Sequence, residues 1–211
     1  MHRFNITTAV AVGWSVLSVA ALAQDATAPE TEPETLQSQT ASVIVLDTNA
    51  PKTEMEAFEA QTGTVIIKGA SQVGSVLGQT GAVSVRSKES KDASSGRKVY
   101  GIAVGLSENS RPEDTMIIDY NELDSLLNGI DYILKLNRTV TALPSFSAAY
   151  TTKGGLRIAA FSSNNRPGTI QAVLQSSHRI RSRVLLAPDQ LAKFRALIQQ
   201  AKSDLDALRA K

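Results

Sequence analysis

Alternation of apolar and polar residues dominates the chain from Thr62 onward. A period of two is typical of strands with one buried face, and polar or glycine-rich stretches separate the runs. The first set of predicted strands covers Thr64–Lys68, Ala82–Ser87, Lys98–Leu106 and Thr115–Asp119. The spacing then changes to three and four residues, which predicts a helix over about Asn121–Leu136.

The same order of elements recurs in the second half of the structured region. The predicted strands there are Ser145–Thr152, Leu156–Ser162, Thr169–Ser176 and Ile180–Leu186, and a helix is predicted over about Asp189–Leu208. Consecutive short strands are most simply paired side by side with their neighbours. The pattern therefore predicts an α+β fold of two tandem ββββα repeats, whose antiparallel sheets are each covered by one helix.

Residues as well as elements repeat. Met116–Leu126 aligns with Val184–Phe194 at a constant spacing of 68 residues, and Ile130 falls opposite Ile198. Each segment is a short apolar strand that turns directly into a helix. We interpret this as an internal duplication and divide residues 53–211 into repeats 62–137 and 144–211.

Each predicted helix carries one narrow apolar stripe with charges on its other side. Such a stripe favours packing on a sheet. The stripe from Leu191 to Leu208 also fits a heptad, so a coiled coil is an alternative, although it spans fewer than three heptads. The oligomeric state is left open by the sequence, and the end of this helix is where the contact of a homo-oligomer would be sought.

The first 23 residues have the three-part pattern of a secretory signal peptide. Arg3 supplies a positive start, Ile6–Ala20 is an apolar run without charge, and Ala21–Ala23 supplies small residues before Gln24. A transmembrane anchor is the alternative, but it needs about 20 consecutive apolar residues. The pattern predicts export to the periplasm or beyond, and no other segment predicts a stable membrane span.

Residues 24–52 have the composition of a disordered acidic linker. Pro, Glu, Thr and Ala dominate the beginning of this segment, and large apolar residues are scarce there. The short run Val43–Leu46 interrupts it and is either a docking segment or a locally apolar piece of linker.

Charge and cysteine content narrow the classes of function. The chain contains no cysteine, which excludes disulfides, thiolate catalysis and cysteine-ligated metals. The near-neutral total hides a gradient, since residues 24–61 hold eight acids and one base whereas residues 153–211 hold eleven bases and three acids. Such blocks of charge influence which partners can approach.

Catalytic and cofactor motifs are weak throughout. His178 is the only histidine outside the signal peptide, and no catalytic spacing surrounds it. Ser95 and Lys98 fit a Ser-x-x-Lys pattern but fall in a predicted polar loop, Lys88–Arg97. Gly74, Gly78 and Gly81 are predicted to form turns, as are Gly154 and Gly155 between two strands. The sequence thus predicts no catalytic residue, no metal site and no cofactor.

One cluster of cations does support a binding hypothesis. Alternation along the last predicted strand places Arg179, Arg181 and Arg183 on the face opposite Ile180, Val184 and Leu186. The same alternation places Arg157, Gln171 and Gln175 on that open face, together with Phe161. Arginine forks bind phosphate, carboxylate or sulfate groups. The alternative is an ordinary solvated face on which arginine deters association.

Two segments resemble parts of the Whirly and Pur-alpha type of fold. They are Leu156–Ala160, as a central strand, and Arg183–Phe194, as the junction between the last strand and its helix. The resemblance covers residues 62–211 and implies binding of single-stranded nucleic acid on the sheets. The hairpin sequence Tyr150–Gly155 is also similar to that of exported bacterial families of unknown activity.

Three hypotheses follow. The first is an exported non-enzymatic interaction module whose partner is a protein or a polyanion of the cell envelope. The second is binding of single-stranded nucleic acid on the arginine-bearing sheet. The third is an enzyme that uses only Ser, Lys and carboxylates, which would require a pocket with two acids of raised pKa.

Overall fold

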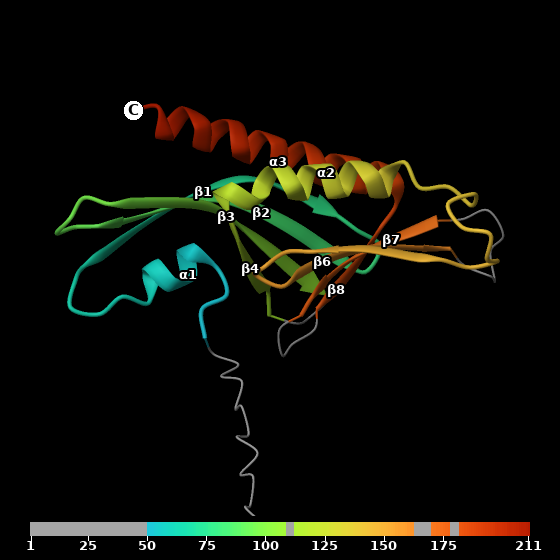
Figure 1. Ribbon diagram of the computed structural model, residues 1–211, viewed down its shortest axis with the longest axis horizontal. Helices are drawn as coiled ribbons and strands as arrows, with labels where there is room; N and C mark the ends of the chain where they lie inside the picture. The colour runs from blue at the N-terminus through green and yellow to red at the C-terminus, as the bar shows by residue number, and fades with distance from the viewer. Residues whose placement is uncertain (1–49, 109–111, 163–169, 178–181) are drawn as a thin grey trace, which may run out of the picture. The chain divides into compact units, whose positions relative to one another are not determined.

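Two four-stranded antiparallel sheets, each followed along the chain by a helix, form the fold in the computed structural model (Figure 1). The structure describes residues 50–108, 112–162, 170–177 and 182–211, which all belong to the unit Asp47–Lys211. The predicted signal peptide and residues 24–49 of the predicted linker lie outside the described residues. The predicted α+β architecture of two sheet-and-helix repeats is confirmed.

In both repeats the strands lie in their order along the chain. The first repeat contains β1 (Ile66–Leu77), β2 (Gly81–Asp92), β3 (Lys98–Glu108), β4 (Asp114–Asp119), a single 3-10 turn η1 (Tyr120–Glu122) and α2 (Leu123–Leu134). The second repeat contains β5 (Ser147–Thr151), β6 (Leu156–Ser162), β7 (Ile170–Ser176), β8 (Arg183–Leu186) and α3 (Pro188–Arg209). A short helix, α1 (Glu54–Glu59), precedes the first sheet.

The first two strands are longer than predicted. β1 continues past Lys68 to Leu77, and Gly74 lies inside it at a register shift rather than in a turn between strands. β1 is an edge strand with mostly exposed side chains, so it lacks the alternation that marks a half-buried strand. β2 likewise continues through the predicted polar loop to Asp92, because Lys88 and Ser90 contact Glu59 instead of solvent alone.

Helix α1 was not predicted from the sequence. Its six residues are too few for a helical period, and a capping box between Thr53 and Glu56 defines its start. The carboxylate of Asp119, at the end of β4, accepts hydrogen bonds from the backbone nitrogens of Glu54 and Met55 at 2.7 and 3.0 Å. Met55 then packs in a small buried cluster on the outer face of the first sheet, away from the long helices.

Each long helix packs mainly on the sheet of the other repeat. α3 lies against β1 and β2, and α2 lies against β5 and β6. The predicted helical stripes are buried except at Leu208, which is 39% exposed, but a stripe does not specify which sheet it covers. Because the two helices exchange sheets, one continuous apolar core contains residues from both repeats.

The two helices also lie side by side and run antiparallel (Figure 1). Asp131 near the end of α2 accepts two hydrogen bonds from Arg195 near the start of α3, at 2.6 and 2.8 Å. Asp124 at the start of α2 lies 3.6 Å from the Lys202 ammonium further along α3. These polar contacts fix the register of the helix layer.

A hairpin turn of each repeat lies against the last strand of the other. Gly154, between β5 and β6, approaches the Ile117 carbonyl of β4 so closely that a Cβ would overlap it. Gly78, after β1, has the same relation to β8, where a Cβ would lie 2.6 Å from the Leu185 carbonyl oxygen. Only Gly155 of the Gly154–Gly155 pair has a positive φ, of 89°. The predicted turn role therefore applies to Gly155, whereas Gly154 is required by close packing.

Candidate functional site

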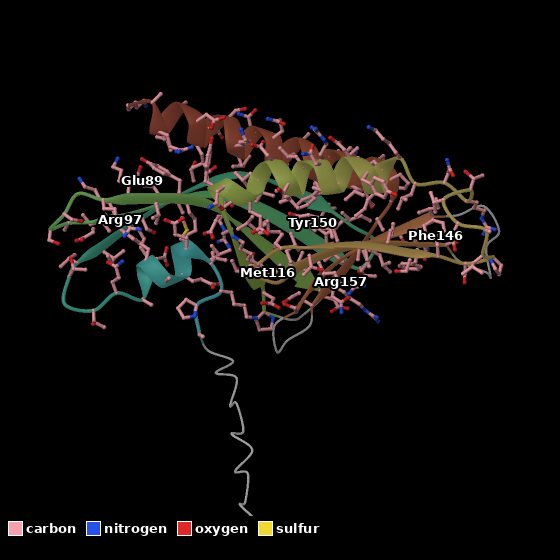
Figure 2. The ribbon with its side chains drawn as sticks, viewed as in Figure 1. Glu89, Arg97, Met116, Phe146, Tyr150 and Arg157 are labelled. Atoms are coloured by element: carbon pink, nitrogen blue, oxygen red, sulfur yellow. The ribbon has the colours of Figure 1, made fainter. Side chains whose placement is uncertain are left out.

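The outer face of the second sheet carries the predicted cationic residues. Strand register places Thr151, Arg157, Gln175 and Arg183 in one row across β5, β6, β7 and β8. Their neighbours Ile158, Leu174 and Val184 are buried on the inner face, as the alternation predicts. Arg157 lies on the side of the strands away from α2 and α3 (Figure 2). Arg179 and Arg181 lie outside the described residues.

The two described arginines of this row differ in their electrostatic surroundings. Arg183 has a side chain that is 70% exposed, and its Nε lies 3.9 Å from the Glu108 carboxylate at the end of β3. Arg157 is exposed, and no described residue forms an ion pair with it. Adjacent strands are about 4.8 Å apart, so the two side chains emerge roughly 10 Å from each other. An extended anion could therefore contact both.

The next row of this face is apolar, in contrast to the polar face predicted from the sequence. It consists of Ala149, Ala159, Val173 and Leu185. Beyond it, Phe161 pairs with Gln171 and Ser147. The sequence did contain a signal for this row, because Val173 and Leu185 occupy the alternate positions of their strands, next to the buried Leu174 and Val184. The face is thus amphipathic rather than uniformly polar, and Phe161 is its one described aromatic side chain.

The β1–β2 turn closes the free edge of the second sheet. The backbone nitrogen of Gln79 donates to the Leu185 carbonyl at 2.8 Å, and the Leu185 nitrogen donates to the Thr80 hydroxyl at 3.1 Å. The Thr80 hydroxyl also lies 3.4 Å from the Arg183 carbonyl oxygen, so the turn contacts β8 at both positions. The arginine row is consequently presented on main chain that both repeats hold in place.

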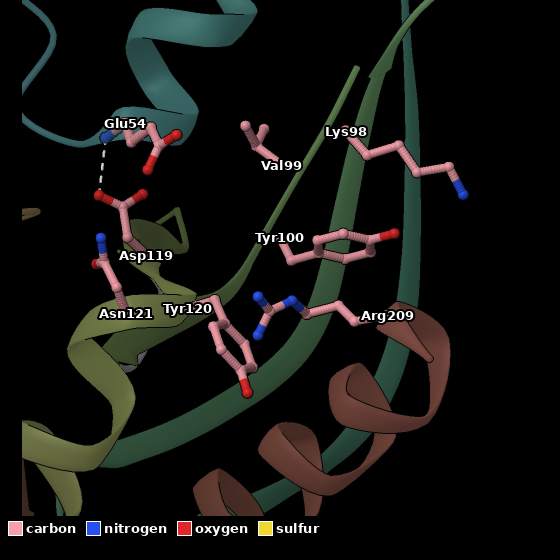
Figure 3. A pocket seen from close by; sticks show the side chains of 8 residues that line it. All are labelled: Glu54, Lys98, Val99, Tyr100, Asp119, Tyr120, Asn121 and Arg209. Carbon is pink, nitrogen blue, oxygen red and sulfur yellow. Dashed lines mark hydrogen bonds between the residues drawn. The ribbon is translucent and has the colours of Figure 1, made fainter. Parts of the chain in front are cut away.

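A second candidate site is a cleft of about 250 Å³ where α1, β3 and the end of α3 meet (Figure 3). The Arg209 guanidinium lies 3.9 Å from the centre of the Tyr120 ring, and the Tyr120 hydroxyl donates to Asp206. This hydrogen bond lowers the pKa of Asp206. Asp119, which also lines the cleft, is engaged in capping α1. The charged groups are therefore satisfied within the protein, and the cleft holds no poised acid–base pair.

The carboxyl groups with displaced pKa values are all shifted downward among the described residues. The pKa of Glu59 falls from 4.5 to about 2, because hydrogen bonds from Lys68, Ser90 and Lys88 outweigh the opposing effect of burial. Ser95, the serine of the Ser-x-x-Lys pattern, donates to Asp92 at 2.6 Å and lies in the β2–β3 turn. These arrangements stabilise structure and differ from the raised acids that general acid catalysis uses.

Two further properties concern the described part of the chain only. It contains no cluster of three or more His, Asp or Glu side chains arranged to hold a metal ion. None of its helices is long and apolar enough to cross a bilayer. His178 lies outside the described residues.

No protein-family model matches the chain, and no significant match was found among curated proteins or solved structures.

Proposed function

We propose that this protein is an exported, non-enzymatic binding module of the cell envelope, and that it binds an extended polyanion on the outer face of its second sheet. The observation that carries the proposal is the row formed by Arg157, Gln175 and Arg183. It offers two guanidinium groups with an amide between them on a face that no described helix covers. Export follows from the N-terminal sequence pattern alone.

The composition of the face supports a polyanion over a purely apolar partner. Arginine donates paired hydrogen bonds to phosphate, sulfate or carboxylate groups, and Gln175 can donate to the same chain of acceptors. The adjacent apolar row formed by Ala149, Ala159, Val173 and Leu185 provides area for the uncharged parts of such a ligand. Single-stranded nucleic acid is the second candidate, and it is supported by Phe161 as a stacking surface on the same face, beyond the apolar row.

The test is a titration of fluorescent dextran sulfate and of a fluorescent single-stranded oligonucleotide with the purified chain. The change is Arg157→Ala together with Arg183→Ala, and the control is Arg97→Ala, whose side chain is 58% exposed in the first repeat. We expect the double variant to weaken binding at least tenfold, because two charge-assisted contacts are lost. We also expect affinity to fall steeply with salt.

The outcomes separate the hypotheses. Preference for the oligonucleotide would favour the nucleic-acid function, and Arg181→Ala combined with Arg183→Ala should then also abolish binding. Binding of neither probe, or equal loss in the Arg97→Ala control, would refute the proposed face.

A further inference from the structure

β1 is an edge strand, and its outer side is free. It ends the first sheet, and β2 is the only described segment whose backbone pairs with it. Residues 67–72 are all exposed. The outer edges of β4 and β8 differ, because the β5–β6 turn lies against the first and the β1–β2 turn hydrogen-bonds to the second. The unpaired backbone groups of β1 are therefore a template on which another strand can pair.

The part of this edge that can pair is residues 66–72. The register with β2 shifts between Gln72 and Gly74, and the Gln72 side-chain amide donates to the Gly74 carbonyl at 2.9 Å. A bulge of this kind ends regular pairing. A lysine on an edge can deter a second strand, but the Lys68 ammonium lies 2.8 Å from the Glu59 carboxylate of α1 on the outer face. Its charge is thus balanced within the same copy, and the edge stays accessible.

A groove of about 260 Å³ lies beside this edge, between the first sheet and the end of α3. Two small residues of β1, Gly69 and Ser71, form part of its floor, and Leu205 and Leu208 of α3 form its other wall. Ser71 pairs with Ser87, which alternates with buried core residues of β2, so the groove is on the inner face of the sheet. Leu208 is 39% exposed. The described part of the chain therefore leaves this groove open along β1.

Ile67 is a large apolar side chain on the same face of β1, and it lies outside both apolar clusters. It is 55% exposed and alternates in phase with Gly69 and Ser71. If two β1 strands pair antiparallel about a twofold axis at Gly69, Ile67 of each strand stands opposite Ser71 of the other. Each isoleucine then enters the groove of the other copy. Lys68 stands opposite Ala70, so no like charges oppose each other across the pair.

We propose that two copies of this chain associate through β1 and join their first sheets into one antiparallel sheet of eight strands. Ile67 and the groove that receives it are on one strand and are exchanged by a twofold axis, which is what an isologous contact requires. This self-complementarity selects a second copy over an unrelated strand. The end of α3 forms one wall of the contact, which is where the sequence directs the search for a homo-oligomer contact. The arginine row is on the second sheet, so the dimer presents two such rows.

The test is sedimentation equilibrium of the purified chain over a range of concentrations. We expect a monomer–dimer equilibrium whose dissociation constant rises roughly tenfold or more in Ile67→Asp, because a charge would enter the apolar groove of the other copy. Leu208→Asp changes the groove instead of the side chain that fills it, and it should have the same effect. The matched control is Leu77→Asp, on the same strand beyond the bulge and 76% exposed, which should leave the dissociation constant unchanged. All three side chains are exposed, so each variant should keep the wild-type circular dichroism spectrum.

Disulfide cross-linking tests the register. The chain contains no cysteine, so a Gly69→Cys variant has a single thiol, and at the twofold axis the two Cα atoms lie within the range that a disulfide spans. We expect oxidation with diamide to link this variant into a covalent dimer, whereas Ser75→Cys, exposed beyond the bulge, should link far more slowly. A monomeric mass at every concentration, a dimer that Ile67→Asp and Leu208→Asp leave intact, or equal cross-linking at both positions would each overturn the proposal.

Discussion

Gly154→Ala tests the reciprocal contact between the repeats. The added Cβ would overlap the Ile117 carbonyl oxygen and lie 2.9 Å from the carbonyl carbon and 3.2 Å from the Thr53 methyl group. Because the obstacle is main chain of β4, it cannot move aside as a flexible side chain could. Overpacking of this kind costs about 3 kcal/mol, the upper end of the usual range. For a unit of this size that corresponds to a fall in Tm of roughly 6–12 °C.

The control is Gly69→Ala on β1, where the nearest atom to a new Cβ is the Glu89 carbonyl oxygen at 3.9 Å. That contact is ordinary, so the substitution should stabilise by about 0.5 kcal/mol through the unfolded chain. Urea unfolding followed by circular dichroism gives both values, since the only tryptophan, Trp14, lies in the predicted signal peptide. A Gly154→Ala variant within about 0.5 kcal/mol of wild type, with an unchanged m value, would refute the close contact.

Two other predictions concern charged groups. The pKa of Glu59 lies below its value in the unfolded chain, so its contribution to stability is present above pH 4.5 and is lost as pH falls toward 2. The free energy of unfolding measured across this pH range should therefore fall less steeply for Glu59→Gln than for the wild type. An unchanged slope would contradict the lowered pKa of Glu59. A double-mutant cycle of Asp131→Asn and Arg195→Gln should give a favourable coupling energy, because Arg195 donates two hydrogen bonds to the Asp131 carboxylate. Additive effects of the two substitutions would show that the helix register depends on apolar packing alone.

How well the sequence predicted each strand depended on burial. β6 was predicted to the residue, and β7 and β4 to within one residue, because their alternate side chains enter the core. β1 was predicted for only its first few residues, since an edge strand with exposed side chains leaves no alternation to recognise. α1 depends on Asp119, which is far away in the sequence and so gives no local signal.

The candidate sites followed a similar division. Arg157 and Arg183 could be placed on one face because alternation determines the direction of a side chain once a strand is recognised. The ion pair of Arg183 with Glu108 could not be predicted, because it requires knowing how the two sheets meet. An apolar cleft of about 230 Å³ could not be predicted for the same reason, because its lining comes from the end of α2, the second sheet and the start of α3.

Matched positions of the two repeats show why a duplicated sequence need not give two identical units. Gly129 of α2 faces the Tyr150 ring of β5, where a Cβ would lie 2.6 Å from the ring. Leu197, which is 68 positions after Gly129, faces Gly74 of β1, where a Cβ would lie 2.7 Å from its methyl group. The small residue is on the helix in one repeat and on the strand in the other. In each repeat one small and one large residue together set the distance between helix and sheet. The two residues can exchange sides without changing that distance, so the repeats keep the same fold although their sequences differ at these positions. Tyr100 and Tyr120 of the first repeat likewise stand where the second repeat has Ile170 and Pro188, and each pair lines a cleft. The first cleft is rich in charged side chains and the second is apolar, which is how two related units can acquire different surfaces.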